Sequence, residues 1–201
     1  MMATTHALWG MALALPVLAL APEFAPVAFG AGLVGGLFPD LDLYAGHRRT
    51  FHFPVYASLA AVPAIALAIV APLPWTVAFA AGLAAAALHA ASDAAGGGLE
   101  LRPWRASSER AVYSHYHGRW LPPRRWVRYD GAPEDLALAV LAAIPLLVVG
   151  DGRVAGVAVA LLAASLVYVL LRKPLAALVE HLARLVPASV RPYVPERYRD
   201  A

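Results

Sequence analysis

The sequence contains no cysteine, and only 14% of its 201 residues are charged. Without cysteine, disulfide bonds and thiolate metal ligands are both excluded, so any metal ion must be bound by His, Asp, Glu or backbone oxygen. The shortage of charge is matched by an excess of hydrophobic residues, which make up 61% of the chain. This balance lies outside the usual range of soluble domains and indicates a membrane protein.

Uncharged apolar segments run through the chain at lengths suited to crossing a bilayer. A helix rises about 1.5 Å per residue, and the hydrocarbon core is about 30 Å thick. Four segments are long enough or nearly so, and two others are shorter and interrupted by Gly or Pro. We therefore expect an all-α, polytopic bundle of about six transmembrane spans. The expected spans are residues 7–21, 27–38, 55–70, 75–91, 136–149 and 154–171, with 27–38 and 136–149 the shorter two.

Basic residues are distributed unevenly between the connections. Of the 16 Lys and Arg residues, only Arg153 lies in the three short connections expected on one side of the membrane; all the others lie in 41–53, 96–135 and 172–201. Because basic loops remain in the cytoplasm, this asymmetry predicts a multi-pass protein of the plasma (inner) membrane with both termini cytoplasmic. The first six residues include no basic residue, so we expect the first apolar segment to be a span and not a cleaved signal peptide.

Four regions follow from this pattern: the first four spans (1–95), a polar cytoplasmic insert (96–135), the last two spans (136–171) and a tail (172–201). The Ala-rich and Gly-containing fourth span suits close packing between helices. In the tail, apolar residues recur at helical spacing, which predicts an amphipathic C-terminal helix on the membrane surface.

The insert interleaves Arg with aromatic residues, a composition that two classes of partner could explain. Beside a membrane, it favours contact with lipid, because aromatic rings sit at headgroup depth and Arg attracts anionic headgroups. Stacking on single-stranded nucleic acid is the less favoured alternative, so we expect no nucleic-acid partner. Within the insert, Tyr113, His115 and His117 would share one face of a strand, and a solvated hairpin explains them more simply than metal ligation.

Seven His and Asp residues flank the first four apolar segments, where an ionisable side chain is costly unless it is paired or ligating. They are His6, Asp40, Asp42, His47, His52, His89 and Asp93. His89 and Asp93 are four residues apart, so a helix would place them on one face. An extended chain after Pro39 would project Asp40 and Asp42 to one side, whereas a helical turn would separate them and leave only one to ligate. The charge-based topology places all seven at the same membrane face.

Four His and three Asp offer imidazole and carboxylate ligands, the set used by Zn, Mn and Fe. They exceed the needs of one tetrahedral ion, so both a two-metal site and one ion supported by outer carboxylates are open. A divalent metal ion activates water and polarises the bond under attack, which is the chemistry of hydrolysis. Arg48 or Arg102 could bind a phosphate or carboxylate group of the substrate through two parallel hydrogen bonds.

Each group of residues also has a structural interpretation. A His such as His6 at the start of a membrane helix is often only an interfacial residue, and an Asp pair at a helix end often caps it. His47 and His52 could be ordinary loop residues. The helical pair formed by His89 and Asp93 is the strongest single signal, because a structural interpretation leaves its carboxylate near the hydrocarbon without a partner.

The order of these motifs resembles the membrane-bound metal-dependent hydrolase family, which includes LexA-binding, inner-membrane-associated proteins. The resemblance covers residues 1–104 and is carried by Thr5-His6, Pro39-Asp40-Leu41-Asp42, His47-Arg48 with His52, and His89 with Ser92-Asp93. It implies a multi-pass helical bundle with a divalent-metal site formed by the seven residues above. The chain departs from the family pattern at Leu43, where a His is common, and between His47 and His52, where the Thr is shifted.

These features favour a metal-dependent hydrolase at the cytoplasmic membrane surface, acting on a lipid or phosphoester, with Asp40, Arg48 and Asp93 in catalytic roles. One or two Zn, Mn or Fe ions are the expected cofactor, and membrane lipids are the expected partners. A metal or proton transporter is an alternative, but it would carry its ionisable residues near the middle of the membrane. A non-catalytic module that docks lipid or protein through the basic insert is another.

Overall fold

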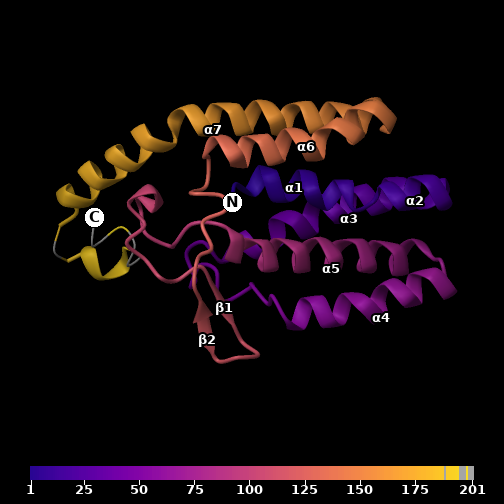
Figure 1. Cartoon of the computed structure of the whole chain (residues 1–201), viewed down its shortest axis with the longest axis horizontal. Coiled ribbons are helices and arrows are strands. Elements are labelled where there is room, and N and C mark those ends of the chain that lie inside the picture. Colours follow the sequence, from indigo (N-terminus) through magenta and orange to yellow (C-terminus); the bar gives the residue numbers. More distant parts are fainter. Residues whose placement is uncertain (188, 195–197, 199–201) are drawn as a thin grey trace.

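A computed structural model of the chain describes residues 1–187, 189–194 and 198, and within them the protein is mostly helical (Figure 1). The α-helices are α1 (Ala3–Ala12), α2 (Leu15–Leu20), α3 (Ala25–Leu37), α4 (Tyr56–Val70), α5 (Pro74–Ser92), α6 (Pro133–Val149) and α7 (Gly152–Leu185). Short 3₁₀ helices are η1 (Pro22–Phe24), η2 (Phe38–Asp42), η3 (Asp93–Ala95), η4 (Pro103–Arg105) and η5 (Arg191–Tyr193). The strands β1 (Val112–Ser114) and β2 (Arg119–Leu121) form one antiparallel hairpin.

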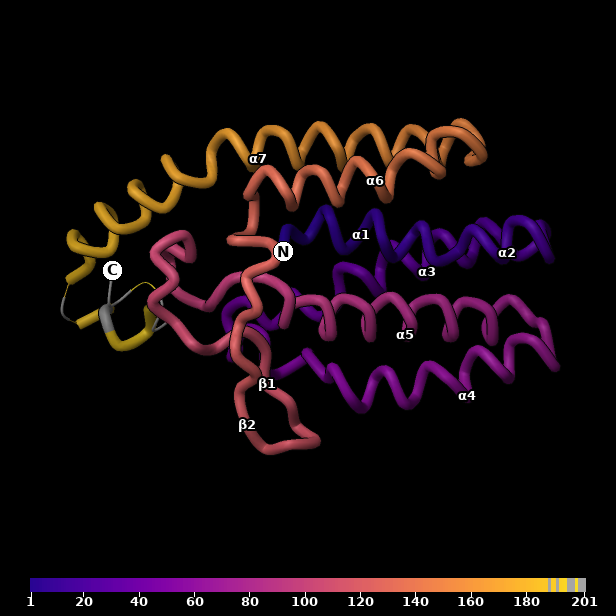
Figure 2. Tube along the Cα trace, viewed as in Figure 1, coloured from indigo at the N-terminus to yellow at the C-terminus, as the bar shows by residue number. Residues whose placement is uncertain are grey.

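The long helices lie side by side in a bundle (Figure 1). Helices α1 and α3 pack against each other in the middle, α5 and α4 lie on one side of them, and α6 and α7 cover α1 on the other. The chain turns between α4 and α5 and between α6 and α7 at one end, while the N-terminus and the insert lie at the other (Figure 2). The ends of elements far apart in the sequence therefore meet beside the insert.

Glycines allow the central helices to approach each other closely. A Cβ atom at Gly35 of α3 would lie only 2.1 Å from the backbone oxygen of Gly82 in α5, and one at Gly10 of α1 would lie 2.2 Å from the oxygen of Gly32. No side chain fits at such distances, so glycine is required where α3 crosses α1 and α5. Small residues at helix crossings are typical of membrane bundles.

Four helical stretches are long and apolar enough to cross a membrane: Ala3–Leu20, Pro22–Asp42, Pro74–Ala95 and Gly152–Leu185. Helix α4 is apolar but shorter. Large apolar side chains also cover the outer surface of the bundle, such as Ile69 and Val148, whose exposed fractions are 73% and 76%. The prediction of a helical protein with several membrane-length helices is therefore confirmed.

Proline residues explain two differences from the expected segment boundaries. The apolar segment 7–21 is divided into α1 and α2, because Pro16 lacks an N–H donor and its ring clashes with a carbonyl in the preceding turn. Conversely, the expected amphipathic helix of the tail is continuous with the sixth apolar segment in α7, with Pro174 inside the helix. Figure 1 shows α7 bending away from α6 toward its C-terminal end. Arg197 and Arg199 of the basic tail lie outside the described residues.

The insert contains the predicted hairpin, which contacts the loop between η2 and α4. Tyr113 pairs with Trp120 across the two strands. The backbone N–H of Tyr113 donates to the carbonyl oxygen of Arg48 at 2.9 Å, and Nε2 of His115 lies 2.7 Å from the carbonyl oxygen of Arg49. The hairpin thus holds the loop that carries His47 and His52 against the end of the bundle.

Candidate metal centre

The seven predicted His and Asp residues all lie at the end of the bundle beside the insert. His6 comes from α1, Asp40 and Asp42 from η2, His47 and His52 from the following loop, His89 from α5 and Asp93 from η3. All of them except Asp40 and His47 are buried. Residues separated by more than 80 positions are thereby in contact, since Nε2 of His6 lies 3.3 Å from Oδ1 of Asp93.

Asp40 and Asp42 face different groups because the chain after Phe38 forms a 3₁₀ helix and is not extended. Oδ1 of Asp40 lies 3.5 Å from Nε2 of His89 and 4.0 Å from Nε2 of His52. Asp42 is turned away from these atoms toward the loop. Of the two alternatives for this pair, the helical one is therefore present.

The buried carboxylate of Asp42 organises the loop that follows it. Five nitrogen atoms lie within 3.3 Å of an oxygen of this carboxylate. Three belong to backbone N–H groups and two to imidazole rings. The donors are the backbone N–H groups of Arg48, Arg49 and Phe51 and the Nδ1 atoms of His47 and His52. Asp42 therefore fixes the position of His52, and both of its carboxylate oxygens face these five nitrogens.

Hydrogen bonds at Nδ1 determine which nitrogen of His52 and His89 faces the centre. Nδ1 of His52 donates to Asp42 at 3.0 Å, and Nδ1 of His89 donates to the carbonyl oxygen of Gly36 at 2.6 Å. The Asp42 carboxylate and the Gly36 carbonyl can only accept a hydrogen bond, so Nδ1 of each ring carries a proton. In the neutral form of each ring, Nε2 then carries a lone pair. Metal-binding histidines are oriented in this way, with the far ring nitrogen donating to a carboxylate or carbonyl.

Four side-chain atoms lie near one another: Nε2 of His52, Nε2 of His89, Oδ2 of Asp93 and Oδ1 of Asp40. Oδ2 of Asp93 lies 3.2 Å from Nε2 of His52 and 3.6 Å from Nε2 of His89. With the two Asp40 distances, the four separations between a histidine nitrogen and a carboxylate oxygen run from 3.2 to 4.0 Å. A tetrahedral ion with ligands at about 2.1 Å holds them about 3.4 Å apart, so these four separations are close to those in a metal shell.

Three of these four atoms are buried without a hydrogen-bond partner in the part of the chain that the structure describes. They are Nε2 of His52, Nε2 of His89 and Oδ2 of Asp93. An unpaired buried polar atom is costly, and a native structure rarely keeps several together without a reason. A bound cation would satisfy all three at once.

His6 extends the cluster on the far side of Asp93. Its Nε2 approaches Oδ1 of Asp93, while the other oxygen of that carboxylate faces His52 and His89. The rings of His6 and His89 are stacked with centroids 3.6 Å apart. Ligand atoms of His6, His89 and Asp93 lie within 4.8 Å of one another, as do those of Asp40, His52 and His89. The geometry therefore offers two overlapping ligand sets that share His89.

Arg48 brings a buried positive charge next to the cluster. Its Nε lies 3.4 Å from Oδ2 of Asp93, and its NH1 group donates to the carbonyl oxygen of Gly97 at 2.9 Å. Burial opposes this charge, but Asp93 and Asp130 outweigh it and raise the pKa of Arg48 above its usual value. Burial also disfavours protonated His52, yet the hydrogen bond to Asp42 and the nearby Asp93 carboxylate raise the pKa of His52 above its usual value. The same negative surroundings would attract a metal cation.

Two of the predicted residues lie farther from the ligand atoms. His47 is held behind Asp42, with its ring centroid 5.9 Å from that of His52. Arg102 forms an ion pair with Glu180 of α7 and does not reach the cluster. The carbonyl of Gly36 was not predicted, because a backbone group leaves no signal in the sequence. Thr5 of the Thr5-His6 motif donates to Asp135 at 2.8 Å and so ties α1 to the start of α6.

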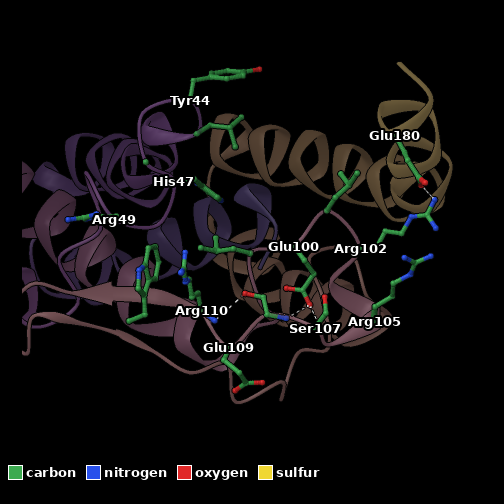
Figure 3. Close-up of a pocket in the computed structure, with 16 residues that line it drawn as sticks. Tyr44, His47, Arg49, Glu100, Arg102, Arg105, Ser107, Glu109, Arg110 and Glu180 are labelled. Carbon is green, nitrogen blue, oxygen red and sulfur yellow. Dashed lines mark hydrogen bonds and ion pairs between the residues drawn. The ribbon is translucent and has the colours of Figure 1, made fainter. Parts of the chain in front are cut away.

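Two cavities border the cluster. The smaller, of about 500 Å³, is lined by Asp40, His47 and Arg48 and by apolar residues of α7. The larger, of about 850 Å³, is lined by Leu43, Tyr44, Gly46, His47 and Arg49 of the loop, by the insert and by Glu180 (Figure 3). Among the four ligand atoms named above, that of Asp40 belongs to a residue lining the smaller cavity, and the Asp40 side chain is 26% exposed.

No protein-family model, curated protein or solved structure matches this chain. The chemistry available to the site therefore depends on its own ligand atoms, their burial and the cavities beside them.

Proposed function

We propose that the protein is a membrane-bound metal-dependent hydrolase with its His/Asp site at the cytoplasmic end of the helical bundle. The observation that carries this proposal is the convergence beside Asp40 of three buried atoms of His52, His89 and Asp93 that have no hydrogen-bond partner. Imidazole nitrogen and carboxylate oxygen in equal number, without sulfur, suit Zn, Mn or Fe. His6, through the other oxygen of Asp93, could support a second ion.

Each residue of the site would have a separate role in metal binding or in hydrolysis. A divalent ion at this position would supply Lewis acidity and the activation of water near neutral pH. Asp40 lines the smaller cavity and is the carboxylate placed to move a proton to or from a substrate. Arg48 lines the same cavity and would neutralise negative charge that develops there. Asp42 and the carbonyl of Gly36 would hold His52 and His89 in their ligating orientation.

The proposed topology has six spans, with α4 and α6 crossing the membrane beside the four longer stretches. Arg153 begins α7 at the end of the bundle opposite the insert, whereas Arg48 lies beside the insert. This asymmetry supports cytoplasmic termini and a cytoplasmic site in the plasma (inner) membrane. Because the ligand atoms gather at one end of the bundle and not at its middle, hydrolysis is favoured over transport of a metal ion or proton.

Hydrolysis assays on purified protein in neutral detergent test the proposal. Bis(p-nitrophenyl) phosphate and p-nitrophenyl butyrate serve as probes before chelation, after chelation and after addition of Zn or Mn. We expect chelation to abolish turnover and one of the ions to restore it.

Asp40→Asn should lower kcat by about 100-fold or more, as loss of a general acid–base group does. Asp151→Asn, at the far start of α7, is the matched control. Turnover that survives both chelation and the double change His52→Ala, His89→Ala would refute the proposal.

A further inference from the structure

The smaller cavity has one polar wall and one apolar wall. Asp40 and Arg48 of the candidate metal centre line the first, and Leu175, Ala176 and Val179 of α7 line the second. The volume of about 500 Å³ is in the range of sites for small organic ligands. Such a cavity suits a molecule with a polar group at one end and a hydrocarbon chain at the other.

Aromatic and basic residues of the kind found at lipid-headgroup depth lie beside this cavity. The guanidinium carbon of Arg172 lies 5.3 Å from the centre of the Trp104 ring, and Nζ of Lys173 lies 5.7 Å from that ring and 5.8 Å from the ring of Tyr129. Trp and Tyr together with Lys and Arg are typical of the boundary between hydrocarbon and water. The apolar wall formed by Leu175, Ala176 and Val179 follows Arg172 and Lys173 along α7, so it lies on the cytoplasmic side of this level. A lipid would therefore raise its chain out of the hydrocarbon to reach this wall.

The larger cavity adjoins the smaller one and carries unpaired positive charge. His47, Leu99, Glu100 and Leu101 line both cavities. Three arginines of the larger cavity form no ion pair with any described carboxylate; they are Arg49, Arg105 and Arg110. Figure 3 shows Arg105 at the end of this cavity nearest Glu180.

Two of the three carboxylates of the larger cavity are paired with arginines, and the third is that of Glu100. Oε1 of Glu100 accepts hydrogen bonds from the backbone N–H groups of Ser107 and Ser108, so Glu100 offsets only one of the three arginine charges. Glu109 pairs with Arg125, and Glu180 pairs with Arg102 and Arg184. Figure 3 shows Glu109 pointing away from the cavity. The free charge of the cavity is therefore positive, and guanidinium groups bind phosphate through charge-assisted hydrogen bonds.

We infer that the two cavities together bind an anionic membrane lipid. Its hydrocarbon chain lies against α7 in the smaller cavity, and its phosphate headgroup faces Arg105 and Arg110 in the larger one. The linkage between chain and headgroup then lies beside Asp40. This inference rests on the proposed function, because it takes the bound lipid as the substrate of the candidate metal centre.

Binding of hexylphosphonate to the full-length protein in neutral detergent tests the inference without turnover, because the carbon–phosphorus bond of this probe resists hydrolysis. Methylphosphonate carries the same headgroup without the chain, and 1-hexanol carries the chain without the charge. Calorimetry should show hexylphosphonate binding at least 10-fold more tightly than either. Burial of two methylene groups already contributes about 10-fold in affinity, so partial burial of the chain reaches this threshold.

Matched variants show which cavity binds the alkyl chain of the probe and which binds its phosphonate group. Val179→Trp fills the apolar wall and should weaken hexylphosphonate binding at least 10-fold, while Leu178→Trp, on the neighbouring exposed position outside the cavity, should not. Leu175→Asn makes the same test without added bulk. The double change Arg105→Gln, Arg110→Gln should weaken hexylphosphonate and methylphosphonate alike, while Arg153→Gln at the far end of α7 should weaken neither.

Equal affinity for hexylphosphonate and methylphosphonate, or equal effects of Val179→Trp and Leu178→Trp, would overturn the inference. Metal content measured on the same samples separates this outcome from failure of the proposed function. Protein that retains metal but shows no preference for the alkyl chain overturns the inference alone. Protein that binds hexylphosphonate as predicted but never retains metal supports the lipid site and contradicts the hydrolase proposal.

Discussion

Two aspartates separated by one residue have different positions at this site. Asp40 faces the Nε2 atoms of His52 and His89, whereas Asp42 is surrounded by five donors from the loop after it. The difference arises from the 3₁₀ turn that begins at Phe38, which rotates consecutive side chains away from a common side. A carboxylate at each position is therefore needed for a different reason.

Asp42→Ala should weaken metal binding because Asp42 orients the ring of His52. Without the carboxylate, His52 loses the acceptor that fixes its ring, and partners of this kind are worth about 10- to 100-fold in metal affinity. Competition with a chromogenic chelator measures the change. Asp151→Asn alters a helix cap far from the site and should leave the affinity unchanged. Equal metal affinity in Asp42→Ala and wild type would contradict the positioning role.

The grouping of the site residues could be predicted from the sequence, but their roles could not. Asp93 and His89 are conspicuous because ionisable side chains are rare beside apolar segments, and the distribution of basic residues places them at one membrane face. The separate roles of Asp40 and Asp42 depend on the backbone after Pro39, for which both an extended and a helical course were open. The carbonyl of Gly36 could not be predicted, because every residue has one.

At the scale of helices, the site depends on how closely α3 approaches α1 and α5. Gly36 contributes its carbonyl to His89, and a Cβ atom there would lie 2.5 Å from the backbone oxygen of His6. Gly35, on the adjacent position, contacts the backbone of Gly82. The close helix contacts that join these glycines therefore also set the distance between His6 and His89.

Gly35→Ala should destabilise the bundle, whereas Gly30→Ala in the same helix should not. The added methyl group at Gly35 would meet the Gly82 oxygen at 2.1 Å, and overpacking of this kind costs about 1–3 kcal/mol or more. A Cβ atom at Gly30 would have no neighbour within 4 Å, so alanine is accommodated there. Thermal unfolding in detergent compares the two variants. A similar melting temperature for both would contradict the close contact between α3 and α5.

The insert is joined to α7 by a carboxylate whose charge is stabilised by the fold. Nε of Arg172 donates to Asp130 at 2.9 Å, and the hydroxyl of Tyr168 also donates to Asp130. Burial opposes the charge of Asp130, but Arg172 and Tyr168 outweigh it and hold the pKa of Asp130 below its usual value. A lowered pKa in the folded state means that the ion pair contributes stability at neutral pH. That contribution is lost as the pH falls below about 4.

Asp130→Asn should therefore lower stability at pH 7 but have a smaller effect at pH 3. Hydrogen bonds to charged groups contribute about 1.5–3 kcal/mol, which sets the expected difference at neutral pH. Thermal unfolding of wild type and variant between pH 3 and pH 7 measures it. A difference in melting temperature that is independent of pH would show that the charge of Asp130 does not stabilise the contact between the insert and α7.

Element boundaries could not be predicted from the positions of prolines in the sequence. Pro16 divides the first segment, while Pro63, Pro145 and Pro174 lie inside α4, α6 and α7 without ending them. Proline is excluded from a helix interior only when the surrounding packing cannot accommodate the missing hydrogen bond and the kink. Helix α7 bends instead of breaking, and packing of this kind is not visible in one sequence.

For the whole molecule, the bundle places its ligand atoms and its insert at the same end (Figure 1). The hairpin contacts the backbone of the His47–His52 loop through Tyr113 and His115, so the insert holds the site together as well as bordering its larger cavity. The lengths of the uncharged apolar segments and the charge asymmetry predicted a helical membrane protein with a polar insert. The contact between insert and loop could not be predicted, because it joins backbone groups more than 60 positions apart.

Elemental analysis of detergent-purified protein tests the central claim most directly. The metal shell formed by His52, His89, Asp93 and Asp40 predicts that wild type and Asp151→Asn retain at least one Zn, Mn or Fe ion per chain after extensive dialysis. His89→Ala and Asp93→Ala, if folded as judged by thermal unfolding, should retain a small fraction of that amount. Wild-type protein without stoichiometric metal, or His89→Ala and Asp93→Ala protein with as much metal as wild type, would contradict the account.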